Sequence, residues 1–117
     1  MAMVVQMHEG VAINKFKLDK PLLRIGRDPA SDIFIDNTVV SNEHAVIKTE
    51  DRPEPGAGVE FYVEDLNSTN GTLVNGVGFD RHLLKHGDKI QVGKHTFIFD
   101  SGQGDMEETA IYLPDNE

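Results

Sequence analysis

The chain has 117 residues, which suits a single compact domain with its own hydrophobic core. Its formal net charge is −9 and it contains no cysteine, so the sequence offers neither a positive stripe for nucleic acid nor thiols for disulfides or metal. No apolar run approaches the roughly 20 residues of a membrane helix. We therefore expect a cytoplasmic protein with no cofactor, no bound metal, no nucleic-acid partner and no membrane insertion.

Short segments with alternating or wholly apolar residues follow one another along the chain, which predicts β-strands. The expected strands are residues 4–7, 12–18, 22–25, 33–35, 45–48, 59–66, 73–74, 89–92 and 95–99. Tight-turn pairs such as Glu9-Gly10 and Gly93-Lys94 separate neighbouring segments. No window has a sustained apolar period of 3.6 residues. The pattern predicts an all-β fold, a sandwich of two antiparallel sheets.

Two stretches interrupt this pattern. Residues 51–58 are rich in proline and glycine and predict a surface loop within a hairpin. After Phe99 the composition becomes polar, glycine-rich and acidic. We place the domain at residues 1–102 and expect residues 103–117 to be a flexible acidic tail or linker.

The pair Gly26-Arg27 ends an apolar segment, and its glycine permits a sharp turn. In isolation, such an arginine is most often a solvated surface residue. A guanidinium held on a loop is also suited to clamp an anion, because its planar donors match phosphate oxygens.

The tetrapeptide Ser41-Asn42-Glu43-His44 lies just before another apolar segment. Ser41 either caps a turn or donates a hydrogen bond to a phosphate oxygen. For His44 we expect a structural role, in which one ring nitrogen donates to a loop carbonyl and joins neighbouring loops. The other histidines show no metal-ligand spacing with it.

Residues 66–76 combine short hydroxyl and amide side chains with two glycines. Gly71 allows a positive φ, and Asn75-Gly76 is a strong turn signal. A hairpin connection explains the Asn-Gly pair but not the preceding row of Ser68, Thr69 and Asn70. That row offers several hydrogen-bonding groups at small entropic cost.

Together these pieces resemble the forkhead-associated (FHA) domain family. Its signature is a Gly-Arg pair, a Ser-x-x-His motif, a Ser/Thr-x-Asn-Gly-Thr loop and an Asn-Gly pair, which correspond here to Gly26-Arg27, 41–44, 68–72 and Asn75-Gly76. The resemblance covers residues 20–99. It implies an FHA-like (SMAD/FHA-type) sandwich of about eleven short strands whose apical loops bind phosphothreonine.

The resemblance also implies roles for single residues. Phosphate contacts fall on Arg27, Ser41 and Thr69, and contacts with the ligand backbone on Asn70 and Asn42. Scaffold roles fall on Gly26, His44, Gly71, Asn75 and Gly76. The expected partners are phosphothreonine proteins of Ser/Thr kinase signalling, either kinase substrates or the kinase itself.

In several family members the loop before the phosphate-binding serine reads the third residue after phosphothreonine. Here that loop contains Val39 and Val40 and no cation, so we expect an apolar preference at that position. Thr109 follows two acidic residues and precedes Tyr112 by three positions. It is a candidate phosphosite and ligand for the chain's own site or a neighbour's; a plain acidic linker is the alternative.

Three other interpretations stay open. The first is a phosphate-independent interaction module. The second is an enzyme using Ser41 with His44, or Ser68 with His82 and Asp65, although no nucleophile elbow or phosphate loop accompanies them. The third is a calcium site, whose carboxylates would be Asp28, Asp32 and Asp36.

Overall fold

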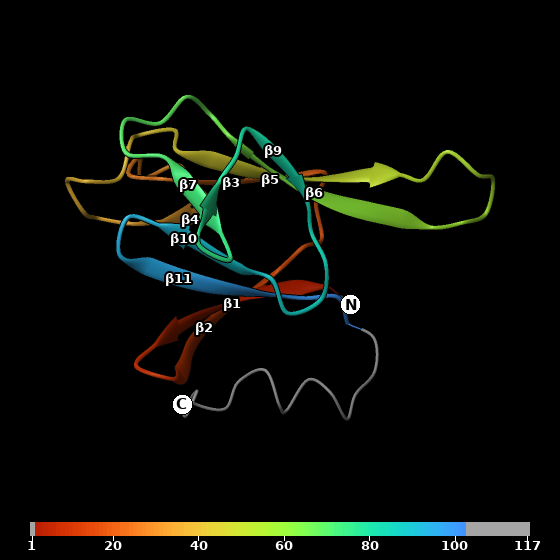
Figure 1. Ribbon diagram of the computed structural model, residues 1–117, viewed down its shortest axis with the longest axis horizontal. Helices are drawn as coiled ribbons and strands as arrows, with labels where there is room; N and C mark the ends of the chain where they lie inside the picture. Colours follow the sequence, from red (N-terminus) through yellow and green to blue (C-terminus); the bar gives the residue numbers. More distant parts are fainter. Residues whose placement is uncertain (1, 103–117) are drawn as a thin grey trace.

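The computed structural model describes residues 2–102, which form a two-layered β-sandwich without helices (Figure 1). The strands in the first half of the domain are β1 (Met3–His8), β2 (Val11–Lys17), β3 (Leu22–Gly26), β4 (Ile33–Phe34) and β5 (Ala45–Asp51). Those in the second half are β6 (Val59–Asp65), β7 (Thr72–Val74), β8 (Val77–Gly78), β9 (Arg81–Leu83), β10 (Lys89–Val92) and β11 (His95–Asp100). The all-β sandwich expected from the sequence is confirmed.

One sheet has the order β2-β1-β11-β10-β7-β8 and the other the order β4-β3-β5-β6-β9. All neighbouring strands are antiparallel except β3 and β4, which pair in parallel through Ile25 with Ile33 and Gly26 with Phe34. This pairing differs from the expected purely antiparallel sheets. Strand β4 has only two residues, and it returns beside β3 through a short irregular loop rather than a hairpin.

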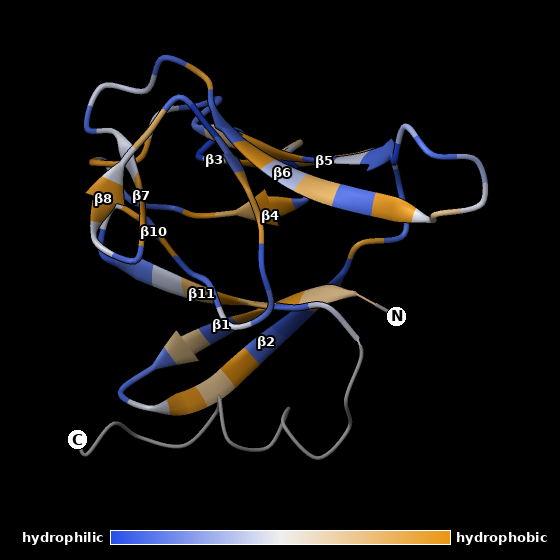
Figure 2. Cartoon of the chain, turned by 45° about the vertical axis from the view of Figure 1, so that its right-hand side comes forward, coloured by the Kyte–Doolittle hydropathy of each residue, from blue (hydrophilic) through white to orange (hydrophobic). Residues whose placement is uncertain are grey.

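The core lies between the two layers and consists mainly of aliphatic side chains with two buried phenylalanines, Phe97 and Phe99. Alternation places every second residue of a strand in this core, and the alternating hydropathy is visible along β6 in Figure 2. A tilted ring contact between Phe61 on β6 and Phe99 on β11 joins the two sheets across the core, and one between Phe16 and Phe97 joins β2 to β11 within the six-stranded sheet. The rigid sandwich holds the loops at its ends in fixed positions.

All nine expected strands are present, with ends that match or shift by up to three residues, but β8 and β9 were not expected. Both are short and lack an alternating pattern. Strand β9 is held by its partner β6, where Tyr62 pairs with Leu83 and Glu64 with Arg81. The proline- and glycine-rich stretch is the tip of the β5–β6 hairpin, as expected, although β5 extends to Asp51.

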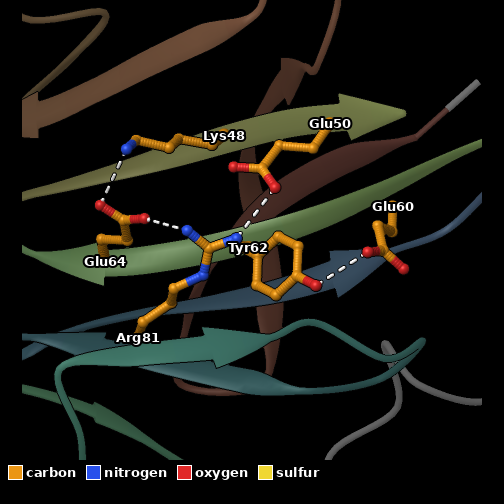
Figure 3. A network of polar contacts seen from close by, with 6 residues as sticks. All are labelled: Lys48, Glu50, Glu60, Tyr62, Glu64 and Arg81. Atoms are coloured by element: carbon orange, nitrogen blue, oxygen red, sulfur yellow. Dashed lines mark hydrogen bonds and ion pairs between the residues drawn. The ribbon is translucent and has the colours of Figure 1, made fainter. Parts of the chain in front are cut away.

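A network of charged side chains covers the outer face of the five-stranded sheet (Figure 3). The Arg81 guanidinium bonds Glu50 and Glu64 at 2.9 and 2.8 Å and lies 3.8 Å from the centre of the Tyr62 ring. Lys48 pairs with Glu64 at 3.0 Å. Val46 lies opposite Glu64 in the sheet and is only 4% exposed. The stems of such long side chains shield apolar surface, although Leu22 and Leu83, the Cα partners of Lys48 and Tyr62 on this face, are each 39% exposed.

No helix within residues 2–102 is long and apolar enough to cross a membrane. The expected boundary at residue 102 and the expected flexible tail at 103–117 remain predictions, because those residues lie outside the described part of the chain.

Candidate functional site

Three loops lie at the same end of the sandwich, opposite the tip of the β5–β6 hairpin (left side of Figure 1). They connect β3 to β4, β4 to β5, and β6 to β7. In chain order, these loops carry Arg27, Ser41 and Thr69. Hydrogen bonds between the loops bring these three residues together.

Gly26 makes the approach of the first two loops possible. A Cβ atom at this position would lie 2.0 Å from the Asn42 carbonyl oxygen. The absence of a side chain therefore allows two backbone bonds, Arg27 N–H to Ser41 O at 2.9 Å and Asp28 N–H to Asn42 O at 3.2 Å. The expected scaffold role of Gly26 thus has a steric reason in this structure.

Arg27 is oriented by a backbone carbonyl of the second loop. Its Nε–H donates to the Val40 carbonyl at 3.0 Å, which fixes the plane of the guanidinium. Arg27 forms no ion pair with any residue in the range 2–102. Its charge and its terminal nitrogens are therefore available to an external anion.

Ser41 and Thr69 are joined directly, although they are far apart in sequence. The Thr69 backbone N–H donates to Ser41 Oγ at 3.0 Å. The Ser41 hydroxyl hydrogen remains available to another acceptor. Since Ser41 O also accepts from Arg27 N–H, all three expected phosphate contacts belong to one connected cluster.

His44 is fully buried and bonds two of the loops that form this cluster. Its Nδ1 accepts from Ser41 N–H at 3.1 Å, and its Nε2 lies 2.8 Å from the Gly71 carbonyl oxygen. A neutral imidazole with its proton on Nε2 satisfies both bonds. The His44 ring thus links the β4–β5 loop to the β6–β7 loop.

Asp65, which the sequence did not suggest as a scaffold residue, organises the third loop. Its carboxylate accepts from the Ser68 N–H at 3.1 Å, the Ser68 hydroxyl at 2.5 Å and the Thr72 hydroxyl at 2.7 Å. Burial alone would raise the pKa of Asp65, but these hydrogen bonds outweigh it and hold the pKa below its ordinary value of 3.8. Two loop hydroxyls therefore serve the fold rather than a ligand.

Asn70 and Val39 form the other side of the site. The Asn70 amide donates to the Val39 carbonyl oxygen at 2.8 Å. Val40 is buried, whereas Val39 is 38% exposed. A Cβ at Gly93 would meet both valines at 3.1 Å, so the β10–β11 turn also supports this loop. This contact joins Gly93 to valines more than 50 positions away in the chain, and no sequence pattern predicted it.

The remaining motif residues lie elsewhere or act through the backbone. Gly71 has φ +82°, and a Cβ placed there would meet no atom within 4 Å, so conformation and not space accounts for this glycine. Asn75 and Gly76 form the β7–β8 turn, where Asn75 bonds Asp88 and the Lys89 N–H. The turn lies at the other end of β7 from the β6–β7 loop, so it supports the sheet rather than the site. The Asn42 side chain is exposed.

The geometry does not favour the enzymatic or calcium interpretations. Ser41 Oγ bonds Thr69 rather than His44, Ser68 Oγ bonds Asp65, and His82 bonds Asp88. The Asp32 carboxylate accepts from the Arg24 N–H, and residues 2–102 contain no group of acidic or histidine side chains arranged for a metal. Thr109 lies outside the described residues.

Among curated proteins, the glycogen accumulation regulator GarA of Mycolicibacterium smegmatis is 42% identical over 89 residues, or 76% of this chain and 52% of GarA. The oxoglutarate dehydrogenase inhibitor of Corynebacterium diphtheriae is 39% identical over 88 residues, or 75% of this chain and 57% of the inhibitor. The chain thus spans little more than half the length of these relatives. Both names describe regulatory proteins.

Solved structures agree with this relationship. Mycobacterium tuberculosis EmbR in complex with a phosphopeptide superposes with a TM-score of 0.73 at 30% identity, covering 88% of this chain and 25% of EmbR. A structure from work on phosphothreonine-dependent FHA domain interactions gives 0.72 at 27% identity, covering 89% of this chain and 100% of that one. The family model of the FHA domain matches residues 23–93, which include all four motifs. The chain belongs to the FHA domain family.

Proposed function

We propose that this domain binds phosphothreonine in partner proteins and so acts as a non-enzymatic interaction module in Ser/Thr kinase signalling. The observation that carries the proposal is the connected cluster of Arg27, Ser41 and Thr69, in which an unpaired guanidinium lies beside an available hydroxyl hydrogen. The structure of EmbR, a structural neighbour, is that of a complex with a phosphopeptide.

The chemistry of the ligand suits this cluster. A phosphothreonine brings nearly two negative charges and three acceptor oxygens. Arg27 supplies a charge-assisted contact, and the Ser41 and Thr69 hydroxyls supply neutral donors. A strongly acidic domain can bind such an anion, because the local field of one unpaired cation counts more than the net charge.

The other site roles follow the same arrangement. We expect the side chains of Asn70 and Asn42 to contact the ligand backbone beside the phosphothreonine. Val39 is exposed and the neighbouring Val40 is buried. We expect Val39 to favour ligands with an apolar residue at the third position after the phosphothreonine. Phosphorylated Thr109, on the same chain or on a neighbouring copy, remains a candidate ligand. Kinase substrates and the kinase itself are the other candidate partners. We also expect a cytoplasmic location.

The test is an NMR titration with three versions of one short peptide, carrying phosphothreonine, threonine or phosphoserine, each with isoleucine at the third following position. We expect shifts at Arg27, Ser41, Thr69 and Asn70 with the phosphothreonine peptide alone. Equal shifts with the unphosphorylated peptide would favour a phosphate-independent interaction module instead.

Arg27→Ala is the matching variant, with Arg24→Ala, at an exposed position on the preceding strand β3, as its control. Loss of the charge-assisted pair should cost about 2–5 kcal/mol of binding free energy. Calorimetry should therefore register no binding by Arg27→Ala and ordinary binding by Arg24→Ala. Equal affinity of the two variants would contradict the proposed clamp.

A further inference from the structure

The two outer faces of the sandwich differ in how their apolar residues are shielded. Val5 and Ile98 are Cα partners on β1 and β11 and are 0% and 7% exposed. Neither belongs to the core cluster, whereas the neighbouring Val4 and Phe99 do. Val5 and Ile98 therefore point away from the core, on the outer face of the six-stranded sheet.

The strands on either side place lysines beside these apolar residues. Lys15 on β2 is the Cα partner of Val5, and Lys89 on β10 is the partner of Ile98. In the next row Lys17 is the partner of Met3, and Met3 is the partner of Asp100. We call Met3, Val5, Lys15, Lys17, Lys89 and Ile98 the β1–β11 outer face.

These lysines are not neutralised by the described part of the chain. All three are exposed, and none forms an ion pair with a residue in the range 2–102. On the opposite sheet, by contrast, Lys48 and Arg81 are both paired with Glu64 (Figure 3), which is the Cα partner of buried Val46. The β1–β11 outer face thus combines an apolar centre with an unpaired cationic border in a protein of net charge −9.

The sequence that follows β11 has the complementary character. Residues 103–117 contain five acidic side chains, no lysine or arginine, and the apolar run Ile111-Tyr112-Leu113. This segment begins beside the face, because Asp100 is the Cα partner of Met3 and accepts a hydrogen bond from Gly102 N–H at 2.8 Å.

The connecting length is sufficient. Nine residues along the chain lead from Gly102 to Ile111, and an extended chain of that length spans about 30 Å. The path along β1 from Met3 to Met7 is only about 13 Å at strand spacing. The apolar run can therefore reach Val5 and Ile98 without strain.

We propose that residues 105–113 of the same chain dock on the β1–β11 outer face. Ile111, Tyr112 and Leu113 cover Val5 and Ile98, and the carboxylates of Asp105, Glu107 and Glu108 lie near Lys15, Lys17 and Lys89. The docked segment holds Thr109 against the side of the sandwich, away from the apical loops, until it is released.

The absence of cysteine makes a direct test simple, because Asn116→Cys provides a single attachment point for a nitroxide spin label. In the full chain we expect the amide signals of Val5, Met7 and Ile98 to broaden severalfold more than those of Tyr62 and Glu64 on the opposite sheet. Equal broadening of both sheets, or none at Val5 and Ile98, would overturn the proposal.

Variants separate the two kinds of contact. Lys17→Glu in the labelled chain should remove most of the selective broadening, whereas Lys94→Glu, the same charge change at the exposed β10–β11 turn, should leave it unchanged. Ile111→Ser with Leu113→Ser should also remove it. If both lysine variants behave alike, the electrostatic part of the proposal is wrong.

A mixed sample distinguishes docking within one chain from docking between copies. Isotope-labelled chain without the nitroxide is combined with nitroxide-labelled chain lacking the isotope. We expect no selective broadening in this mixture. Broadening at Val5 and Ile98 would assign the face to a second copy and overturn docking within the same chain.

Discussion

Replacement of Gly26 by alanine should damage ligand binding more than folding. The new Cβ would lie 2.0 Å from the Asn42 carbonyl oxygen, whereas real Cβ atoms essentially never come closer than 3.0 Å to a neighbour. The segment containing Ser41 and Asn42 must then move away from residue 26 by at least the difference between these two distances, about 1 Å. The bond from Arg27 N–H to Ser41 O would lengthen from 2.9 Å to about 3.9 Å and be lost.

The expected cost follows from this displacement. Crowding of this kind costs about 1–3 kcal/mol of the free energy of unfolding. Misplacement of the Ser41 hydroxyl relative to Arg27 removes one hydrogen bond to a charged group, which is worth about 1.5–3 kcal/mol. The affinity for a phosphothreonine peptide should therefore fall by about 10- to 100-fold.

Calorimetric titration with the phosphothreonine peptide measures the affinity, and thermal unfolding measures the stability. Gly78→Ala is the matched control, because its Cβ would meet only Leu73 Cδ2, at an ordinary 3.8 Å, and its φ is not positive. If Gly26→Ala binds as tightly as Gly78→Ala, the close approach of the two loops does not position the phosphate contacts.

Three further substitutions test other parts of the site. His44→Ala leaves Ser41 N–H and the Gly71 carbonyl unpaired beside a cavity, and denaturant unfolding should show a loss of about 2–5 kcal/mol; a loss under about 1 kcal/mol would refute the bridging role. Asp65→Asn should lower stability at neutral pH by about 1–3 kcal/mol. Because the folded pKa of Asp65 lies below 3.8, the carboxylate stabilises the fold above that pH and loses this effect as pH falls through the folded value. Unfolding curves of the two proteins should converge in strong acid, and a constant difference would contradict this. Val39→Arg should shift selection at the third residue after phosphothreonine from apolar to acidic in a phosphopeptide library. An unchanged profile would separate Val39 from specificity.

The sequence predicted those parts of the fold that depend on local patterns. Alternating residues and tight turns locate β10, β11 and the turn at Gly93-Lys94, because period and turn chemistry act within a few residues. Strand β9 could not be predicted in this way, because its three residues form a strand only through pairing with β6. The parallel pairing of β4 likewise depends on tertiary contact.

The sequence named candidate site residues but not the contacts that join them. Motif spacing predicted scaffold roles for Gly26 and His44, yet the 2.0 Å approach that requires a glycine exists only once two loops have met. No sequence pattern indicated the scaffold role of Asp65, because an aspartate at a strand end is ordinary in sequence. The support of Val39 by Gly93 joins distant positions and needs coordinates to be seen.

The hydrogen bonds between the apical loops have a dynamic consequence. Thr69, Asn70 and Arg27 each bond a neighbouring loop without any ligand. A phosphopeptide therefore meets a surface whose conformational entropy was already lost when the chain folded. Hydrogen exchange of the Arg27 and Thr69 backbone amides, which bond Ser41 without a ligand, should slow little on complex formation. Association should be fast, limited by encounter rather than by rearrangement.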